Sequence, residues 1–160
     1  MTIAFVGDSI TRHGNWDVWF PEQETHNLGV SGDTTADLLD RLDSVVSLAP
    51  ETIALLIGTN DFGNGRRSVE HVVRNIELLL VSLRRDLPGT RTLVQSIMPR
   101  EREYADQLRD ANRHLRQFAP TVHAQYLDLW PAMAGEDGEI VPAYSDDRLH
   151  LTDAGYEAWL

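Results

Sequence analysis

The chain has 160 residues, of which 42% are hydrophobic and 24% charged, and its formal net charge is −11. This composition is that of a folded chain with a real core, so we expect one domain over residues 1–160. The acidic balance argues against a nucleic-acid or anionic-membrane partner. All 14 basic residues are Arg, and there is no Cys, which excludes lysine-dependent and thiol chemistry and Cys-ligated metals.

No apolar run approaches the roughly 18 residues that a membrane span needs. Met1 leads almost directly into the first apolar run, without a signal-like segment. We therefore expect a cytoplasmic protein with no membrane span.

The first apolar run, residues 3–6, predicts a short buried strand that stops at Gly7-Asp8-Ser9. By itself this tripeptide is ordinary turn chemistry, but it places a serine hydroxyl just past a strand end. The polar and aromatic stretch 11–24 follows and predicts a loop with a short helix. Its three large aromatic side chains either line a pocket or pack over the sheet edge, namely Trp16, Trp19 and Phe20.

The rest of the chain alternates strand and helix patterns. Turn residues or Pro close most of them, as Pro50 does for the first helix and Pro88-Gly89 for the second. Residues 128–147 read as a loop, and a last helix begins near Thr152. The expected strands are 26–30, 52–57, 92–97 and 122–127, and the expected helices are 34–49, 68–87 and 104–118.

Strands that alternate with helices imply right-handed crossovers and a parallel sheet covered on both faces. The predicted fold class is therefore α/β, a three-layer α/β/α arrangement around a flavodoxin-like five-stranded parallel sheet of order 2-1-3-4-5. In that order strand 1 lies between strands 2 and 3. The loops that carry Ser9, Gly32 and Asn60 would then converge on one rim.

A serine hydroxyl needs a base, and the base needs a group that orients it. Of the six histidines, His150 alone follows a carboxylate at a suggestive spacing in a late loop, since Asp147 precedes it by three residues. Acyl transfer also needs hydrogen-bond donors for an oxyanion, which backbone N–H groups at Ser9 and Gly32 and the Asn60 amide can supply. Each of these features alone also fits a turn or a helix cap.

Together, four ordered stretches resemble the SGNH hydrolases, the GDSL-type esterase and lipase superfamily. They are Gly7-Asp8-Ser9-Ile10, Gly29-Val30-Ser31-Gly32, Gly58-Thr59-Asn60-Asp61 and Asp147-Arg148-Leu149-His150-Leu151. The size and the C-terminal stretch look like the branch of platelet-activating-factor acetylhydrolases and small bacterial lysophospholipase or acylesterase enzymes.

The resemblance implies a catalytic triad of Ser9 as nucleophile, His150 as base and Asp147 as its orienting acid. The oxyanion hole would comprise Ser9, Gly32 and Asn60. It implies a carboxylic ester hydrolase without metal or organic cofactor, acting on a small-molecule ester. We expect a short acyl chain, because the chain has no long insertion that could form a lid or an extended lipid groove.

Three alternatives remain open at this point: a non-catalytic flavodoxin-like ligand-binding module, and the same chemistry on thioesters or on carbohydrate O-acetyl groups. The final helix would have only about two turns, either naturally or because the sequence stops short.

Overall fold

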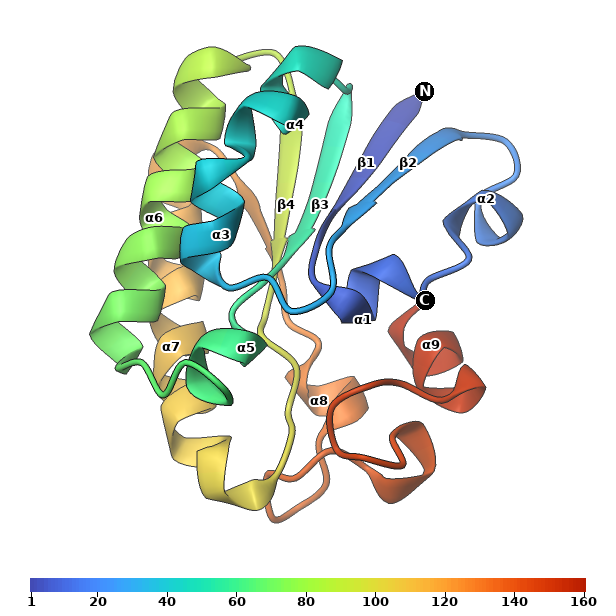
Figure 1. Cartoon of the computed structure of the whole chain (residues 1–160), viewed down its shortest axis with the longest axis vertical. Helices are drawn as coiled ribbons and strands as arrows, with labels where there is room; N and C mark the ends of the chain where they lie inside the picture. Colours follow the sequence, from blue (N-terminus) through green and yellow to red (C-terminus); the bar gives the residue numbers. More distant parts are fainter.

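The five strands form one parallel sheet in the order β2-β1-β3-β4-β5, and the computed structural model describes residues 1–160 (Figure 1). This is the order that the alternating strand and helix pattern predicted. The strands are β1 (Thr2–Gly7), β2 (Glu24–Gly29), β3 (Thr52–Leu56), β4 (Arg91–Gln95) and β5 (Gln125–Leu127).

Helices join the strands and cover both faces of the sheet (Figure 1). The α-helices are α1 (Ser9–Arg12), α2 (Trp16–Trp19), α3 (Thr35–Asp40), α4 (Leu42–Leu48), α5 (Thr59–Phe62), α6 (Val69–Asp86), α7 (Ala105–Phe118), α8 (Trp130–Met133) and α9 (Asp153–Trp159). The 3₁₀ turns are η1 (Arg102–Tyr104), η2 (Ala119–Val122) and η3 (Pro142–Tyr144).

Alternation along the strands divides the core into two layers. Val6 and Leu55 face the larger cluster, which α3, α4, α6 and α7 complete, whereas Phe5 and Leu56 face the smaller one. Successive strand residues point to opposite faces, so both faces of the sheet are covered. The smaller cluster is rich in aromatic rings: Trp16 stacks on Phe5 with ring centroids 4.0 Å apart. The aromatic side chains of the stretch 11–24 therefore pack over the sheet, which was one of the two alternatives expected from the sequence.

The expected helix over 34–49 is wrong in one respect, because it is two helices that meet at Arg41. The apolar periodicity continues through the break, which hides it in the sequence. The Arg41 backbone leaves helical geometry (φ −110°, ψ 14°), and its side chain reaches back to the strand ends, as described below.

Other boundaries also differ from the expectation. The second strand begins at Glu24, two residues early. The fifth begins only at Gln125, because η2 runs to Val122 and His123 after it has a left-handed backbone. The expected loop 128–147 contains α8 and η3. Thr34 and Ser68 cap their helices through side chains that accept the N–H groups of Asp37 and His71.

The strand register aligns the ends of three neighbouring strands. Gly7 of β1 pairs with Gly29 of β2 on one side and with Leu56 of β3 on the other. The loops that follow these strands therefore leave the sheet at the same level, on the edge where ligands bind in open α/β sheets.

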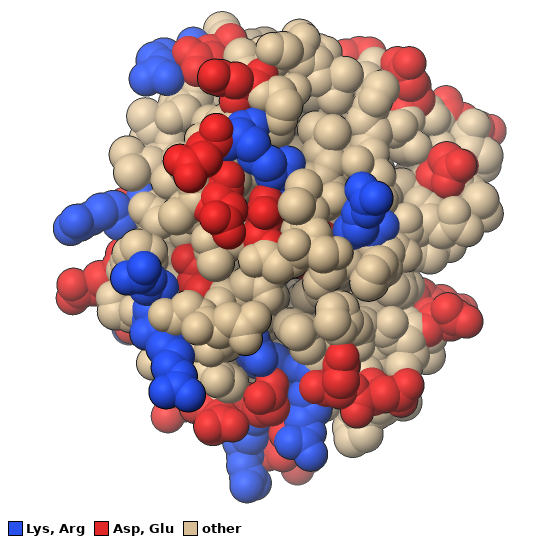
Figure 2. All heavy atoms as spheres, viewed as in Figure 1, with Lys and Arg blue, Asp and Glu red and all other residues tan.

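Acidic and basic side chains are interspersed over the face seen in Figure 2, and acidic ones gather over α3. None of the helices combines the length and apolar character that crossing a bilayer requires.

Candidate active site

The end of β1 places Ser9. A Cβ on Gly7 would lie 2.3 Å from the Leu56 carbonyl oxygen, so the chain passes β3 more closely than any side chain permits. Asp8 then caps α1, its carboxylate accepting the Ile10 N–H at 2.9 Å. Ser9 is consequently the first residue of α1, where a backbone N–H has no intrahelical acceptor. Its hydroxyl lies at the rim although the residue is only 6% exposed.

The structure brings Ser9, His150 and Asp147 together across 141 positions of the chain. The Ser9 Oγ atom lies 3.0 Å from His150 Nε2, and His150 Nδ1 lies 2.7 Å from Asp147 Oδ2. A hydroxyl, an imidazole and a carboxylate in this order can pass a proton from the hydroxyl to the imidazole while the carboxylate fixes the ring.

Local hydrogen bonds hold the Asp147 carboxylate. Its Oδ1 accepts the N–H groups of Leu149 at 2.9 Å and His150 at 2.7 Å, and the Ser145 hydroxyl donates to the His150 carbonyl at 2.6 Å. Desolvation opposes ionisation of Asp147, but the donors from His150 and Leu149 outweigh it and hold its pKa at about 2. The carboxylate therefore stays charged throughout the neutral range.

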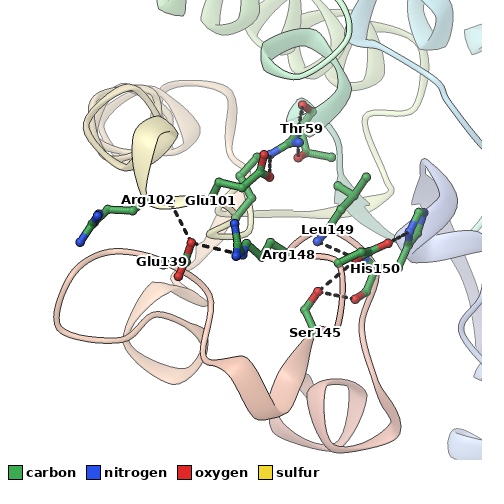
Figure 3. A network of polar contacts seen from close by, with 10 residues as sticks. Thr59, Glu101, Arg102, Glu139, Ser145, Arg148, Leu149 and His150 are labelled. Carbon is green, nitrogen blue, oxygen red and sulfur yellow. Dashed lines mark hydrogen bonds and ion pairs between the residues drawn. The ribbon is translucent and has the colours of Figure 1, made fainter.

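The turn between Asp147 and His150 depends on Arg148, whose φ of 63° lies in the left-handed region. Figure 3 shows the Arg148 side chain directed toward Glu139, and its Nε lies 3.5 Å from Glu139 Oε1. Glu139 Oε1 also accepts the Arg102 N–H at 3.4 Å. These contacts turn the Arg148 charge toward Glu139.

Asn60 and the Gly32 turn meet on the same rim. Asn60 is the second residue of α5, which follows β3, and its side-chain amide donates to the Asp33 carbonyl at 3.0 Å, next to Gly32. One amide N–H remains for another acceptor. Gly32 has a φ of 83°, and its N–H has no acceptor in the chain. Asp61 joins the same two loops, accepting the Thr35 N–H at 2.9 Å.

Arg41 supports this rim from below, a role that the sequence did not reveal. Its Nε donates to Asp33 Oδ2 at 2.6 Å, and its Nη2 donates to the carbonyls of Gly7 at 3.1 Å and Leu28 at 3.0 Å. A single guanidinium therefore ties the ends of β1 and β2 to the Gly32 turn. No spacing rule links Arg41 to these partners.

Arg100 plays a comparable part beneath Asn60 and was also missed. The residue is 8% exposed, and its Nη1 donates to the Thr59 carbonyl at 3.0 Å and to the Thr59 hydroxyl at 3.1 Å. The guanidinium lies over the Tyr104 ring, 4.7 Å from its centroid. The Thr59 carbonyl belongs to the peptide that carries the Asn60 nitrogen, so Arg100 fixes that peptide.

Two buried carboxyl groups beside the site, those of Asp8 and Asp61, have raised pKa values. Burial raises the pKa of Asp8 to about 7, although the Ile10 and Asp8 N–H groups and the nearby His150 oppose the change. Burial also raises the pKa of Asp61, against hydrogen bonds from Thr35. No three His, Cys, Asp or Glu side chains gather where they could hold a metal ion.

Two hollows of similar volume lie on the surface. One, of about 620 Å³, runs beside the N-terminal half of α6 and includes Asp110 and His114 of α7, and the other, of about 600 Å³, is lined by charged side chains that include Glu139 and Arg148. Ser9, Asp147 and His150 line neither of them. The Asp147 side chain is 54% and the His150 side chain 41% exposed, so both are open to solvent.

A model of the GDSL-like lipase/acylhydrolase family matches residues 5–158 of this chain. Among curated proteins, the chain is 29% identical to the human platelet-activating factor acetylhydrolase IB subunit alpha2 over 165 residues, covering 96% of this chain and 70% of that protein. It is 27% identical to the bovine subunit alpha1, covering 96% and 69%.

A solved structure points the same way. A protein from Streptococcus pneumonia, described by reference to platelet activating factor, superposes with a TM-score of 0.86 at 30% identity. The match covers 98% of this chain and 78% of that one.

Proposed function

The chain belongs to the GDSL-like lipase/acylhydrolase family, within the SGNH hydrolases, and we propose that it is a serine-type carboxylic ester hydrolase for short-chain acyl esters. Family membership and hydrolase relatives make it an enzyme of the esterase type and argue against a non-catalytic binding module. One observation carries the proposed site: the Ser9 hydroxyl, the His150 imidazole and the Asp147 carboxylate lie in line at 3.0 and 2.7 Å.

In the first half of the proposed reaction, His150 Nε2 removes the proton of Ser9 Oγ as that oxygen attacks the ester carbonyl carbon. The Asp147 carboxylate accepts a hydrogen bond from Nδ1–H, which stays on the ring, and stabilises the imidazolium. The carbonyl oxygen becomes an oxyanion that the N–H groups of Ser9 and Gly32 and the free Asn60 amide proton would stabilise.

When the tetrahedral intermediate collapses, the bond to the alcohol oxygen breaks and His150 returns its proton to that oxygen. The acyl group is then bound to Ser9. Water, deprotonated by His150, attacks the acyl-enzyme in the second half, and the carboxylic acid leaves as Ser9 regains its proton.

Two observations support a short acyl chain. The His150 and Asp147 side chains are open to solvent, and Ser9 lines neither of the two larger surface hollows. The curated relatives are acetylhydrolases by name. Thioesters and carbohydrate O-acetyl groups need the same attack, so direct comparison of acyl donors has to separate them.

The test is hydrolysis of p-nitrophenyl esters from acetate to decanoate by the wild type, Ser9→Ala and His150→Ala. Ser82→Ala and His114→Gln, on α6 and α7, are matched controls that replace the same residue types away from the rim. We expect both site variants to lose at least about 10³-fold in kcat, and both controls to match the wild type.

A fluorophosphonate probe provides the second measurement. It should label the wild type and leave Ser9→Ala unlabelled. A folded wild type that neither turns over any ester nor takes the label would refute the proposal, as would a Ser9→Ala variant of full activity.

A further inference from the structure

His13 lies next to the proposed acid–base pair. It follows α1, and its N–H donates to the Ser9 carbonyl at 3.0 Å, so it stands one helical turn after Ser9. Its ring centroid is 5.7 Å from that of His150, with the planes inclined by 45°. A second imidazole therefore stands beside the first on the solvent side of the rim.

The backbone beneath His13 is fixed. The Asn27 amide donates to the Arg12 carbonyl at 2.9 Å, and the Trp16 indole donates to the Thr11 carbonyl at 2.8 Å. A Cβ on Gly29 would lie 2.3 Å from the Arg12 nitrogen, so α1 and β2 are in close contact. The position of His13 is therefore set by packing rather than by a mobile loop.

The His13 ring has no partner of its own. It is exposed and makes no side-chain hydrogen bond or ion pair with the chain. By contrast, His26 and His114 lie 3.9 and 3.6 Å from Glu24 and Asp110. Both ring nitrogens of His13 are consequently available to a ligand, and one or both can donate.

Charge around the site is uneven. Asp147 lies beside His150, and the nearby Arg148 is turned to Glu139. Arg12 and His13 are exposed at the end of α1, and neither makes an ion pair. The chain as a whole carries a net charge of −11. A negative group of the substrate would therefore be repelled least beside Arg12 and His13.

We propose that His13 forms a subsite for the alcohol part of the ester and selects alcohols that carry an anionic group. The inference rests on the proposed function, because the leaving oxygen must lie within reach of His150 Nε2 to receive its proton. An anionic group on the alcohol, about one ring length from the leaving oxygen, would then lie next to the His13 imidazole. The contact is a hydrogen bond to an anion, which is stronger than one between neutral groups.

The experiment compares 4-acetoxybenzoate with 4-acetoxybenzamide, two aryl acetates that differ in a carboxylate against a neutral amide. The measured quantity is the ratio of kcat/KM for the two esters. We expect the wild type to prefer the benzoate, and His13→Leu to lower the ratio by about tenfold, the equivalent of roughly 1.4 kcal/mol. His13→Gln, which keeps a donor, should lie between them. Inhibition by 4-hydroxybenzoate should weaken in the same order.

The exposed His114→Gln is the matched control and should keep the wild-type ratio. Equal losses for both esters in His13→Leu would overturn the subsite, because they would mean a general disturbance of the site. An unchanged ratio would overturn it as well. If the folded wild type hydrolyses neither ester and is not labelled by fluorophosphonate, the proposed function itself fails and the subsite with it.

Discussion

The site has two halves that are held in different ways. The strand-end half, Ser9, Gly32 and Asn60, stands on three strands that end in register, and both Ser9 and Asn60 are 6% exposed. The loop half, Asp147 and His150, belongs to no helix or strand and is open to solvent. The sheet and its two core layers fix the first half, whereas a few polar contacts fix the second.

The last helix connects the halves. The Tyr156 hydroxyl of α9 donates to the Ile10 carbonyl of α1 at 2.5 Å, and the Trp159 indole donates to Gln95 at 2.6 Å. Since α9 begins three residues after His150 and α1 begins with Ser9, this docking helps to set the distance between His150 and Ser9. The difference between the halves predicts that changes in the loop half alter chemistry with little loss of stability, while changes below the strand ends alter both.

The substitution in the loop half with the largest expected effect on kcat is Asp147→Asn. The amide oxygen can still accept the Leu149 and His150 N–H groups, so the turn is kept, but the NH₂ group now faces His150 Nδ1 and favours the wrong tautomer. We expect kcat to fall by about 10⁴ with only a small fall in melting temperature, because the carboxylate is largely exposed. Asp146→Asn, the exposed neighbour, is the control. A wild-type kcat in Asp147→Asn would remove the carboxylate from the mechanism.

In the strand-end half, Asn60→Ala should lower kcat by about 10²–10³, because one oxyanion donor is lost. The variant should also unfold more easily than Asp147→Asn, since the Asp33 carbonyl loses its partner. Steady-state kinetics and thermal unfolding measure the two effects. An unchanged kcat would exclude Asn60 from the oxyanion hole.

Asp8→Asn sharpens the comparison through pH. The folded-state pKa of about 7 lies above the ordinary 3.8, so between these values the native state holds a proton that the unfolded chain releases. The wild-type free energy of unfolding should therefore fall as pH rises from about 4 to about 7.

Asn stays neutral and can still cap α1. The variant should lose that decline and gain stability relative to wild type, by roughly a few kcal/mol, between pH 4 and 8. Urea unfolding at both pH values measures it, with the exposed Asp43→Asn as control. Parallel pH profiles for Asp8→Asn and wild type would contradict the expectation.

The smallest effect is expected at the connection between the halves. Tyr156→Phe removes the hydrogen bond to the Ile10 carbonyl and keeps the ring packing, at a cost of about 1–2 kcal/mol. That corresponds to a fall of roughly 2–8 °C in melting temperature. If the connection positions His150, kcat should fall a few-fold while KM stays constant. A loss of stability with wild-type kcat would show that the bond is only structural.

The sequence by itself determined the strand order and the family. Apolar runs of strand length, alternating with helical stripes, leave few arrangements for a parallel sheet, and that order puts the Ser9, Gly32 and Asn60 loops on one rim. The pairing of Asp147 with His150 is also local, because three residues of a turn bring the two side chains together. The roles of these residues stay a proposal, but their meeting place followed from the pattern.

Only the tertiary structure decided what holds the rim in place. Arg41 follows the end of α3, and its side chain donates to carbonyls at the ends of β1 and β2. Arg100 fixes the peptide before Asn60, and the Tyr156 hydroxyl connects α9 to α1. His13 and His150 lie side by side only because α9 packs against α1. The physical reason is that periodicity records which face of an element is buried. It carries no information on where a long polar side chain crosses to another element, which depends on distances between segments far apart in the chain.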